Sequence, residues 1–231
     1  MSQPSSPSNG PRLAAGISRL GTESAFEVLA RAEALKREGR DVINLGIGQP
    51  DFPTPPHVVE AAIKALRDGH HGYTPANGIL PLREAVAADL DSRLGAKVDP
   101  DDVLIVPGGK MTMFFAVVMF GEPGAEIVYP DPGFPIYESL IRFVGAKPVP
   151  MMLREANGFS FKADDVLALL TPATRLLILN SPANPTGGAA PKAEMDRLAA
   201  GLERHPRVAI LSDEIYGRII YGGRPHASLL H

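Results

Sequence analysis

The sequence predicts an α/β fold in which a mostly parallel sheet carries helices on both faces. Two observations support this prediction. First, five short runs are almost continuously apolar, which is typical of strands that are covered on both sides. Second, segments with helical spacing of apolar residues separate these runs, and strands that alternate with helices usually form parallel crossovers. The expected strands span residues 103–106, 126–129, 147–151, 175–180 and 207–211.

Three helices are expected ahead of the first strand, over residues 22–39, about 54–69 and 81–94. Thr54 followed by Pro55 is a favourable helix start. In the third helix the spacing predicts that Leu82, Val86 and Leu90 point inward. Helices between the strands are expected to begin at Met111 and to span residues 134–143, 163–170 and 192–204.

The composition excludes several classes of protein. The chain has 231 residues, and 23 Lys and Arg against 26 Asp and Glu give a net charge of −3. It therefore lacks the basic excess that nucleic-acid binding requires. Cysteine is absent, which excludes disulfide scaffolds and thiolate catalysis. The longest apolar run, residues 113–120, is far shorter than the roughly 20 residues that span a bilayer.

The N-terminus is expected to be a flexible tail. Residues 1–16 form this tail, whose Ser- and Pro-rich start has no apolar region of the kind a signal peptide carries. We therefore expect a cytoplasmic protein that associates with neither membranes nor nucleic acid.

Ligands of parallel α/β sheets bind beyond the carboxyl ends of the strands, so the loops that follow each strand are the candidate sites. The first of these loops places a glycine turn, Gly108 and Gly109, before Lys110 at a helix start. Free N–H groups and the helix dipole attract an anion there, which indicates a phosphate site. It is not a Walker A loop, because Leu104 and Met111 replace the required Gly and Ser/Thr. A tight turn without a ligand fits the same residues.

Three further loops carry residues that could contact a flat heterocycle. Phe134 stands on a rigid Pro/Gly turn and could stack on a ring, although a core position is the alternative. Asn184 lies in a stiff loop with two prolines, which also fits a plain polar turn. Asp213 follows a strand and Tyr216 lies three residues later. A carboxylate there is either a helix N-cap or a partner for a ring nitrogen.

Taken together, these loops resemble a known family. Residues 44–52 (NLGIGQPDF) and 72–84 (GYTPANGILPLRE) resemble the N-terminal signatures of class I pyridoxal-phosphate-dependent aminotransferases. Gly-Gly-Lys, Asn-Ser-Pro-Ala-Asn-Pro-Thr-Gly and Ser-Asp-Glu-Ile-Tyr follow in the family's order. The resemblance runs from about residue 17 to the end and is strongest to the aspartate-aminotransferase-like branch. It implies that residues 17–45 are a helical segment of the small domain and that residues 46–231 are the large domain of a fold type I transferase, truncated at its C-terminal end. It also implies pyridoxal 5′-phosphate as the cofactor.

The resemblance implies a role for each matching residue. Gly108, Gly109 and Lys110 would bind the cofactor phosphate. The hydroxyl of Tyr73 would reach the phosphate of a neighbouring subunit, which implies a homodimer of the full-length protein. Gly48, together with the Asn184 amide, would contact the substrate.

The ring of the cofactor would have its own set of contacts. Asp213 would pair with the pyridine nitrogen and keep it protonated, because a nearby carboxylate stabilises the cation. Asn184 and Tyr216 would donate to the phenolic oxygen. Phe134 would stack on one face of the ring, and Ile215 would cover the other. Asp213 and Tyr216 are the expected catalytic residues, and no metal is expected.

The family's Schiff-base lysine is not in the chain. It belongs to a Ser-x-x-Lys turn that lies beyond residue 231 in the family pattern. The chain has lysines at 36, 64, 97, 110, 147, 162 and 192, and of these only Lys110 lies in a candidate cofactor loop, at its phosphate end. We therefore expect the N-terminal portion of an aminotransferase that is inactive by itself, since the nucleophile and base are missing.

Other functions fit the same motifs. Carbon–sulfur lyases and cyclopropane-forming synthases use the same cofactor loops, because the cofactor supplies the chemistry. A non-catalytic fragment that binds pyridoxal phosphate is a further alternative. A transcription factor with an aminotransferase-like domain is disfavoured, since about 20 residues are too few for a DNA-binding module. The expected substrates are an amino acid and a 2-oxo acid, and acidic, aromatic and aliphatic side chains all remain open.

Overall fold

The computed structural model describes residues 11–21, 24–46, 48–50 and 52–230. The chain divides into two compact units. The first, the sheet unit, comprises residues 1–22 and 110–229. The second, the helical unit, comprises residues 23–109 and 230–231. The expected tail falls largely on residues 1–10, outside the described residues, and the predicted domain boundaries at 16/17 and 45/46 stay predictions.

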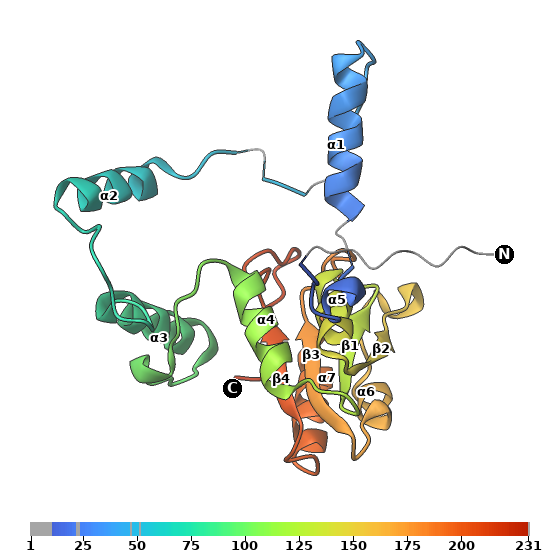
Figure 1. Cartoon of the computed structure of the whole chain (residues 1–231). Helices are drawn as coiled ribbons and strands as arrows, with labels where there is room; N and C mark the ends of the chain where they lie inside the picture. Colours follow the sequence, from blue (N-terminus) through green and yellow to red (C-terminus); the bar gives the residue numbers. More distant parts are fainter. Residues whose placement is uncertain (1–10, 22–23, 47, 51, 231) are drawn as a thin grey trace. The chain divides into compact units, whose positions relative to one another are not determined.

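The sheet unit contains four parallel strands in the order β2-β1-β3-β4 (Figure 1). The strands are β1 (Glu126–Asp131), β2 (Lys147–Met152), β3 (Thr174–Asn180) and β4 (Ala209–Asp213). The register pairs Asn180 with Asp213. The last residues of the two neighbouring strands therefore lie side by side at the carboxyl edge of the sheet.

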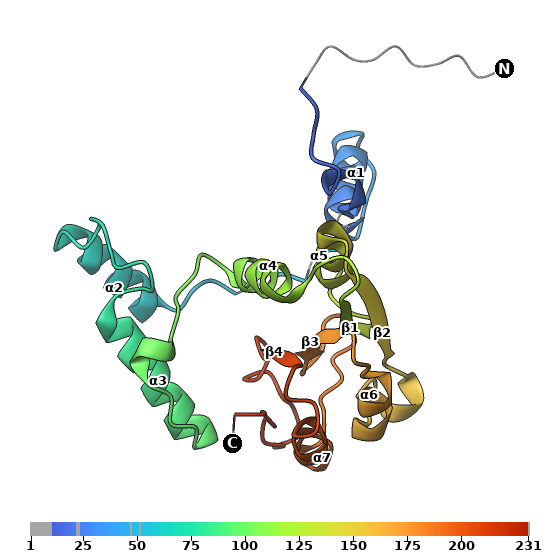
Figure 2. The same cartoon turned by 60° about the horizontal axis from the view of Figure 1, so that its bottom comes forward.

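Helices cover both faces of this sheet (Figure 2). On one face lie α6 (Ala163–Leu169) and α7 (Lys192–Leu202), and on the other α4 (Gly109–Phe120) and α5 (Ile136–Val144). The first core cluster includes Val128, Leu177, Leu179, Val166, Met195 and Leu198, and the second includes Ile127, Leu176, Ile178, Val117, Tyr137 and Ile141. Alternate residues of one strand thus enter opposite cores, which explains why the middle of β1 and of β3 is a continuous apolar run.

The two edges of the sheet differ in sequence. In the part of the chain that the structure describes, β2 pairs only with β1. It carries Pro148 and Pro150, which lack the N–H that a further strand would need. β4 pairs only with β3 among the described residues, and its residues are half-buried or exposed whereas β3 is buried almost throughout. β4 has no proline of the kind that blocks strand addition at β2, and its Ile210 is exposed.

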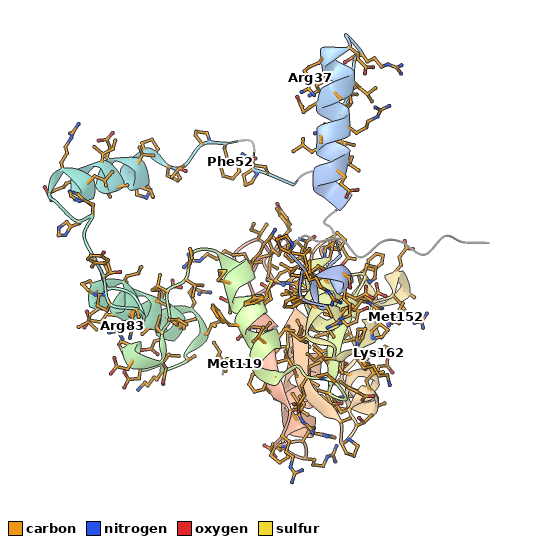
Figure 3. The ribbon with its side chains drawn as sticks, in the orientation of Figure 1. Arg37, Phe52, Arg83, Met119, Met152 and Lys162 are labelled. Carbon is orange, nitrogen blue, oxygen red and sulfur yellow. The ribbon has the colours of Figure 1, made fainter. Side chains whose placement is uncertain are left out.

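The helical unit contains α1 (Ser24–Arg37), α2 (Pro56–Arg67) and α3 (Leu80–Leu94). The predicted inward position of Leu82 is wrong, since 43% of this residue is exposed. Arg83 and Ala87 are buried instead (Figure 3 shows Arg83 on α3). The reason is that the Arg83 guanidinium donates to the carbonyl of Pro100 at 2.7 Å and to the carboxylate of Asp101 at 2.8 Å, which turns that face of α3 toward the 3₁₀ turn Pro100–Asp102.

One predicted strand and two predicted helix starts need correction. Residues 103–106 are extended but form no strand, because no described strand pairs with them, and Leu104 is 62% exposed. The residue at the N-cap of α2 is Pro55 rather than Thr54. α5 begins at Ile136 rather than at Phe134, since the Pro/Gly turn extends through residue 135. The other helices and strands match their predicted ranges to within about three residues.

The N-terminal segment of the sheet unit contacts the end of α5. A 3₁₀ turn, Ile17–Arg19, places the Arg19 guanidinium against the last turn of that helix. Its Nε donates to the carbonyl of Arg142 and its Nη2 to that of Phe143, both at 2.8 Å. A cation at a helix C-terminus satisfies unpaired carbonyls and interacts favourably with the dipole. In the described part of the chain, no helix is both long and apolar enough to cross a membrane.

Candidate functional site

The carboxyl ends of β3 and β4 are joined by one buried side chain, Asn180. Its amide Nδ2 donates to the carbonyl of Asp213 at 3.0 Å. Its Oδ1 accepts from the backbone N–H of Asn184 at 2.8 Å. Asn180 is 6% exposed, so both of its hydrogen bonds are largely shielded from water. It therefore fixes the Asn184 loop relative to the end of β4.

Asn184 and Tyr216 come together at this edge, as the sequence predicts. The Asn184 Nδ2 lies 3.4 Å from the Tyr216 hydroxyl oxygen, which is a long hydrogen bond. Two donors at this separation can also approach a single oxygen acceptor of a bound molecule. The pair therefore forms a candidate binding point for a phenolic or carboxylate oxygen.

Asp213 ends β4 and is half-buried. Its Oδ2 accepts a 2.6 Å hydrogen bond from the hydroxyl of Tyr137, on α5. Its Oδ1 accepts from the backbone N–H of Ile215 at 3.3 Å. Among the described residues no basic side chain forms an ion pair with this carboxylate. A partly desolvated carboxylate without a cation is the chemical environment that a protonated ring nitrogen would complete.

Phe134 and Lys110 lie next to the same tyrosine. The ring of Phe134 packs edge-to-face on Tyr137, with centroids 5.9 Å apart and an interplanar angle of 88°. The Lys110 ammonium lies 5.7 Å from the centroid of the Phe134 ring, within cation–π range. Phe134 is half-buried, so part of its ring is accessible to a bound molecule. The sheet unit thus brings Lys110 and Phe134 together, and through Tyr137 it connects them to Asp213.

The segment that follows β4 is anchored by Glu214. Its Oε1 accepts from the hydroxyls of Ser212 and Ser228, each at 2.8 Å. Its Oε2 lies 2.6 Å from Nε2 of His226. Ser228 is 1% exposed, and the His226 side chain is 8% exposed. These contacts hold residues 226–228 against the strand end that carries Asp213.

Four predicted site residues lie in the helical unit. Gly108 and Gly109 precede the body of α4, Gly108 with a positive φ of 90° and Gly109 as the first helical residue. A Cβ added to either would meet no atom within 4 Å, so the turn has room for a ligand close to the backbone. Gly48 is similarly open, and Tyr73 is fully exposed. Their predicted roles stay predictions.

Several residues of this edge were not predicted from the sequence. Tyr137, Asn180, Glu214 and His226 all contact the predicted residues or hold them in place. The only sequence signal for Tyr137 is its position three residues after Phe134, on the apolar face of a helix. Ile215 is 72% exposed, and its predicted role in covering the second face of the cofactor ring stays a prediction.

The residues of the sheet unit fit a pyridoxal phosphate ring. They offer a carboxylate without a basic partner among the described residues for a ring nitrogen, two donors for a phenolic oxygen and an aromatic ring for stacking. These are the side chains that a pyridoxal phosphate ring at the carboxyl ends of parallel strands would require.

Comparison with known proteins gives the family. The family model "Aminotransferase class I and II" matches residues 40–230, so the chain belongs to this family, whose members depend on pyridoxal phosphate. The predicted family, fold class and cofactor are therefore confirmed.

Individual relatives are similar over most of this chain. The aspartate aminotransferase of Rhizobium meliloti is 37% identical over 210 residues, which are 91% of this chain and 51% of that protein. A bifunctional aspartate and glutamate/aspartate-prephenate aminotransferase of Petunia hybrida is 39% identical over 198 residues, 86% of this chain and 41% of that protein. The chain spans about half the length of the curated relatives it matches.

Solved structures give the same result. The crystal structure of the Rhizobium meliloti aspartate aminotransferase matches with a TM-score of 0.90 at 35% identity, covering 96% of this chain and 56% of that one. The Thermus thermophilus aspartate aminotransferase with maleate matches with a TM-score of 0.89 at 34% identity, covering 95% and 57%. The parallel sheet and its helices therefore have the aminotransferase fold.

The raised pKa values of two buried tyrosines, Tyr129 and Tyr137, predict that the protein loses stability at high pH. Burial raises the pKa of Tyr129 to about 12, with Glu138 as a further cause. Burial also raises the pKa of Tyr137, and its hydrogen bond to Asp213 adds to the effect. Above the ordinary value of 10.0 the unfolded chain loses these protons while the folded chain keeps them. The free energy of unfolding should therefore fall as pH rises, by up to about 1.4 kcal/mol per pH unit for each group.

Urea denaturation of the wild-type chain and of Tyr129→Phe at pH 8, 10, 11 and 12 checks this expectation. The contribution of Tyr129 is fully present below pH 10 and is lost between pH 10 and about 12. The free energy of unfolding of the variant should consequently decline less steeply over that interval. Parallel declines of the two proteins would contradict the assignment.

Proposed function

We propose that this chain is the cofactor-binding N-terminal portion of a pyridoxal-phosphate-dependent aminotransferase. The observation that carries the proposal is the meeting of Asp213, Asn184 and Tyr216 at the carboxyl ends of two adjacent strands, with Phe134 on the neighbouring turn. Because the chain spans about half of its relatives, the activity, substrates and partners of the whole protein belong to this proposal.

Each site residue of the sheet unit has a defined role in this proposal. When bound, pyridoxal phosphate supplies an electron sink for the α-carbon of the amino acid. Asp213 holds a proton at the ring nitrogen, because an adjacent carboxylate favours the charged form. Asn184 and Tyr216 donate hydrogen bonds to the phenolic oxygen. The ring of Phe134 stacks on the pyridine and orients it.

The remaining contacts involve the glycine loop and the helical unit. Gly108 and Gly109, with Lys110, bind the phosphate through backbone N–H groups at the start of α4. Gly48 and the Asn184 amide contact the substrate carboxylate. Tyr73 binds the phosphate of a second subunit, so the whole protein is a homodimer.

The biological setting is part of the same proposal. We infer a cytoplasmic enzyme of amino acid metabolism that moves an amino group between an amino acid and a 2-oxo acid. We also assign residues 17–45 to a small domain and residues 46–231 to a large, cofactor-binding domain.

The chain is expected to bind the cofactor without reacting with it. Of its seven lysines, only Lys110 lies in a cofactor loop, and that loop binds the phosphate end. After incubation with pyridoxal phosphate and borohydride, mass spectrometry should find no labelled lysine, while dialysis without borohydride should show retained cofactor. A single stoichiometrically labelled lysine would contradict the proposed absence of the nucleophile. Failure to retain any cofactor would contradict the site itself.

A further inference from the structure

The hydroxyl of Tyr137 is a polar group placed inside an apolar cluster. Tyr137 is 0% exposed and packs among the residues between α4, α5 and the sheet. Its hydroxyl donates to Asp213 Oδ2 at 2.6 Å. A buried hydroxyl with no partner would cost free energy, so this contact satisfies Tyr137. It also joins α5 directly to the end of β4.

The contact has a consequence for the carboxylate. A hydrogen bond to a charged acceptor is stronger than one between neutral groups. It occupies Oδ2, whereas Oδ1 has only a long contact, 3.3 Å, with the N–H of Ile215. Tyr137 therefore limits the rotation of the carboxyl group and leaves Oδ1 as the more available oxygen.

Tyr137 also remains a donor at every pH at which the protein would work. Its pKa is raised by burial, by the hydrogen bond to Asp213 and by the charge of that carboxylate. The phenol consequently keeps its proton when the carboxylate is ionised, so the pair carries one negative charge rather than two.

We propose that Tyr137 is a positioning residue for the cofactor: its hydroxyl fixes the Asp213 carboxylate in the orientation that holds a proton on the pyridine nitrogen. The inference rests on the proposed function, since it requires Asp213 to be the partner of that nitrogen. The inference gives α5 a second role, because the helix covers the sheet and also influences the protonation of the pyridine nitrogen.

The chain provides a matched control in Tyr129. This tyrosine belongs to the same core cluster, is 8% exposed and has a pKa raised by burial. Its charged neighbours are Glu138, Asp131 and Arg142 rather than Asp213. Tyr129→Phe therefore removes a buried hydroxyl from the same core without touching the proposed nitrogen partner.

The test measures the protonation of the cofactor nitrogen. Pyridoxal phosphate labelled with ¹⁵N in the ring is added to the wild-type chain and to Tyr137→Phe, Tyr129→Phe and Asp213→Asn, and the ¹⁵N shift is followed from pH 6 to 9. In Tyr137→Phe the pKa of the bound ring nitrogen should fall by about one unit, and the dissociation constant should rise about 10-fold, as expected for one charge-assisted hydrogen bond. Tyr129→Phe should match the wild type in the pKa of the bound ring nitrogen and in the dissociation constant.

The outcomes separate the two claims. If Asp213→Asn deprotonates the bound nitrogen but Tyr137→Phe titrates like the wild type, the role of Tyr137 is overturned and the proposed function stands. If Tyr129→Phe shifts the nitrogen as much as Tyr137→Phe does, the effect is one of core packing, and the positioning role is likewise overturned. If Asp213→Asn leaves the nitrogen unchanged, or the wild type binds no cofactor, the proposed function fails and the inference with it. Thermal unfolding of all four proteins shows that each comparison uses folded chain.

Discussion

Replacing Asp213 by alanine should weaken the binding of pyridoxal phosphate about 100-fold, since truncating one partner of a buried, hydrogen-bonded charge pair costs several kcal/mol. The loss has two sources. The protonated ring nitrogen would lose its counter-charge, and the buried Tyr137 hydroxyl would lose its acceptor. Equilibrium dialysis, or the absorbance of the cofactor at increasing protein concentration, measures the dissociation constant.

The matched control for this variant is Asp196→Ala. Asp196 is exposed on α7 and forms its ion pair with Lys192, four residues away on the same helix. Its removal should leave the dissociation constant unchanged, because surface ion pairs contribute little. Equal retention of the cofactor by Asp213→Ala and Asp196→Ala would show that Asp213 is not the partner of the ring nitrogen.

Gly188→Ala should destabilise the chain by about 1–3 kcal/mol, as overpacking commonly does, and should disturb the loop that carries Asn184. A Cβ on Gly188 would lie 2.2 Å from the carbonyl oxygen of Phe159 and 2.6 Å from its carbonyl carbon. These are backbone atoms, which cannot move aside as a side-chain end can. Gly188 also closes the Asn184 loop, because its carbonyl accepts from the N–H of Ala183 at 2.8 Å.

Chemical denaturation measures the free energy of unfolding, with Gly72→Ala as the control. Gly72 has no positive φ, and a Cβ there would meet no atom within 4 Å. The control variant should therefore unfold like the wild type. If Gly188→Ala were as stable as Gly72→Ala and bound the cofactor equally well, the close contact with Phe159 would not constrain the loop.

The sequence predicted the sheet unit well because its signals are local. The central residues of β3, Leu176–Leu179, are apolar because both faces of the strand are covered, and such a run has few other interpretations. The loops that follow β3 and β4 could be placed because residues after parallel strands share one edge of the sheet. The family resemblance assigned Asn184 and Tyr216 to one oxygen, and the register of β3 and β4 shows how the two side chains come together.

The elements that were predicted wrongly depend on partners distant in sequence. Residues 103–106 have the composition of a strand, yet a strand requires a neighbour to pair with. The apolar spacing of α3 suggested that Leu82 was buried, but the contacts of Arg83 with Pro100 and Asp101 turned the adjacent face inward. The spacing of apolar residues along a helix does not reveal side-chain hydrogen bonds of this kind.

The unpredicted site residues have the same explanation. Tyr137 reaches Asp213 across 76 positions in the sequence, through a helix that crosses between β1 and β2. Glu214 contacts Ser228 and His226 from a loop whose sequence shows no regular spacing. The types of residue that could hold the cofactor were visible in the sequence, whereas the residues that orient them became visible only from the packing.

The central claim is that the carboxyl ends of β3 and β4 bind the cofactor ring, and mapping the binding site by NMR tests it most directly. Backbone ¹H–¹⁵N shifts of the labelled chain are recorded during titration with pyridoxal phosphate. The account predicts that saturable shifts concentrate at residues 180–188 and 213–217 and around Phe134, and that Asp213→Ala suppresses them. Saturable shifts that leave these residues unchanged would contradict the account.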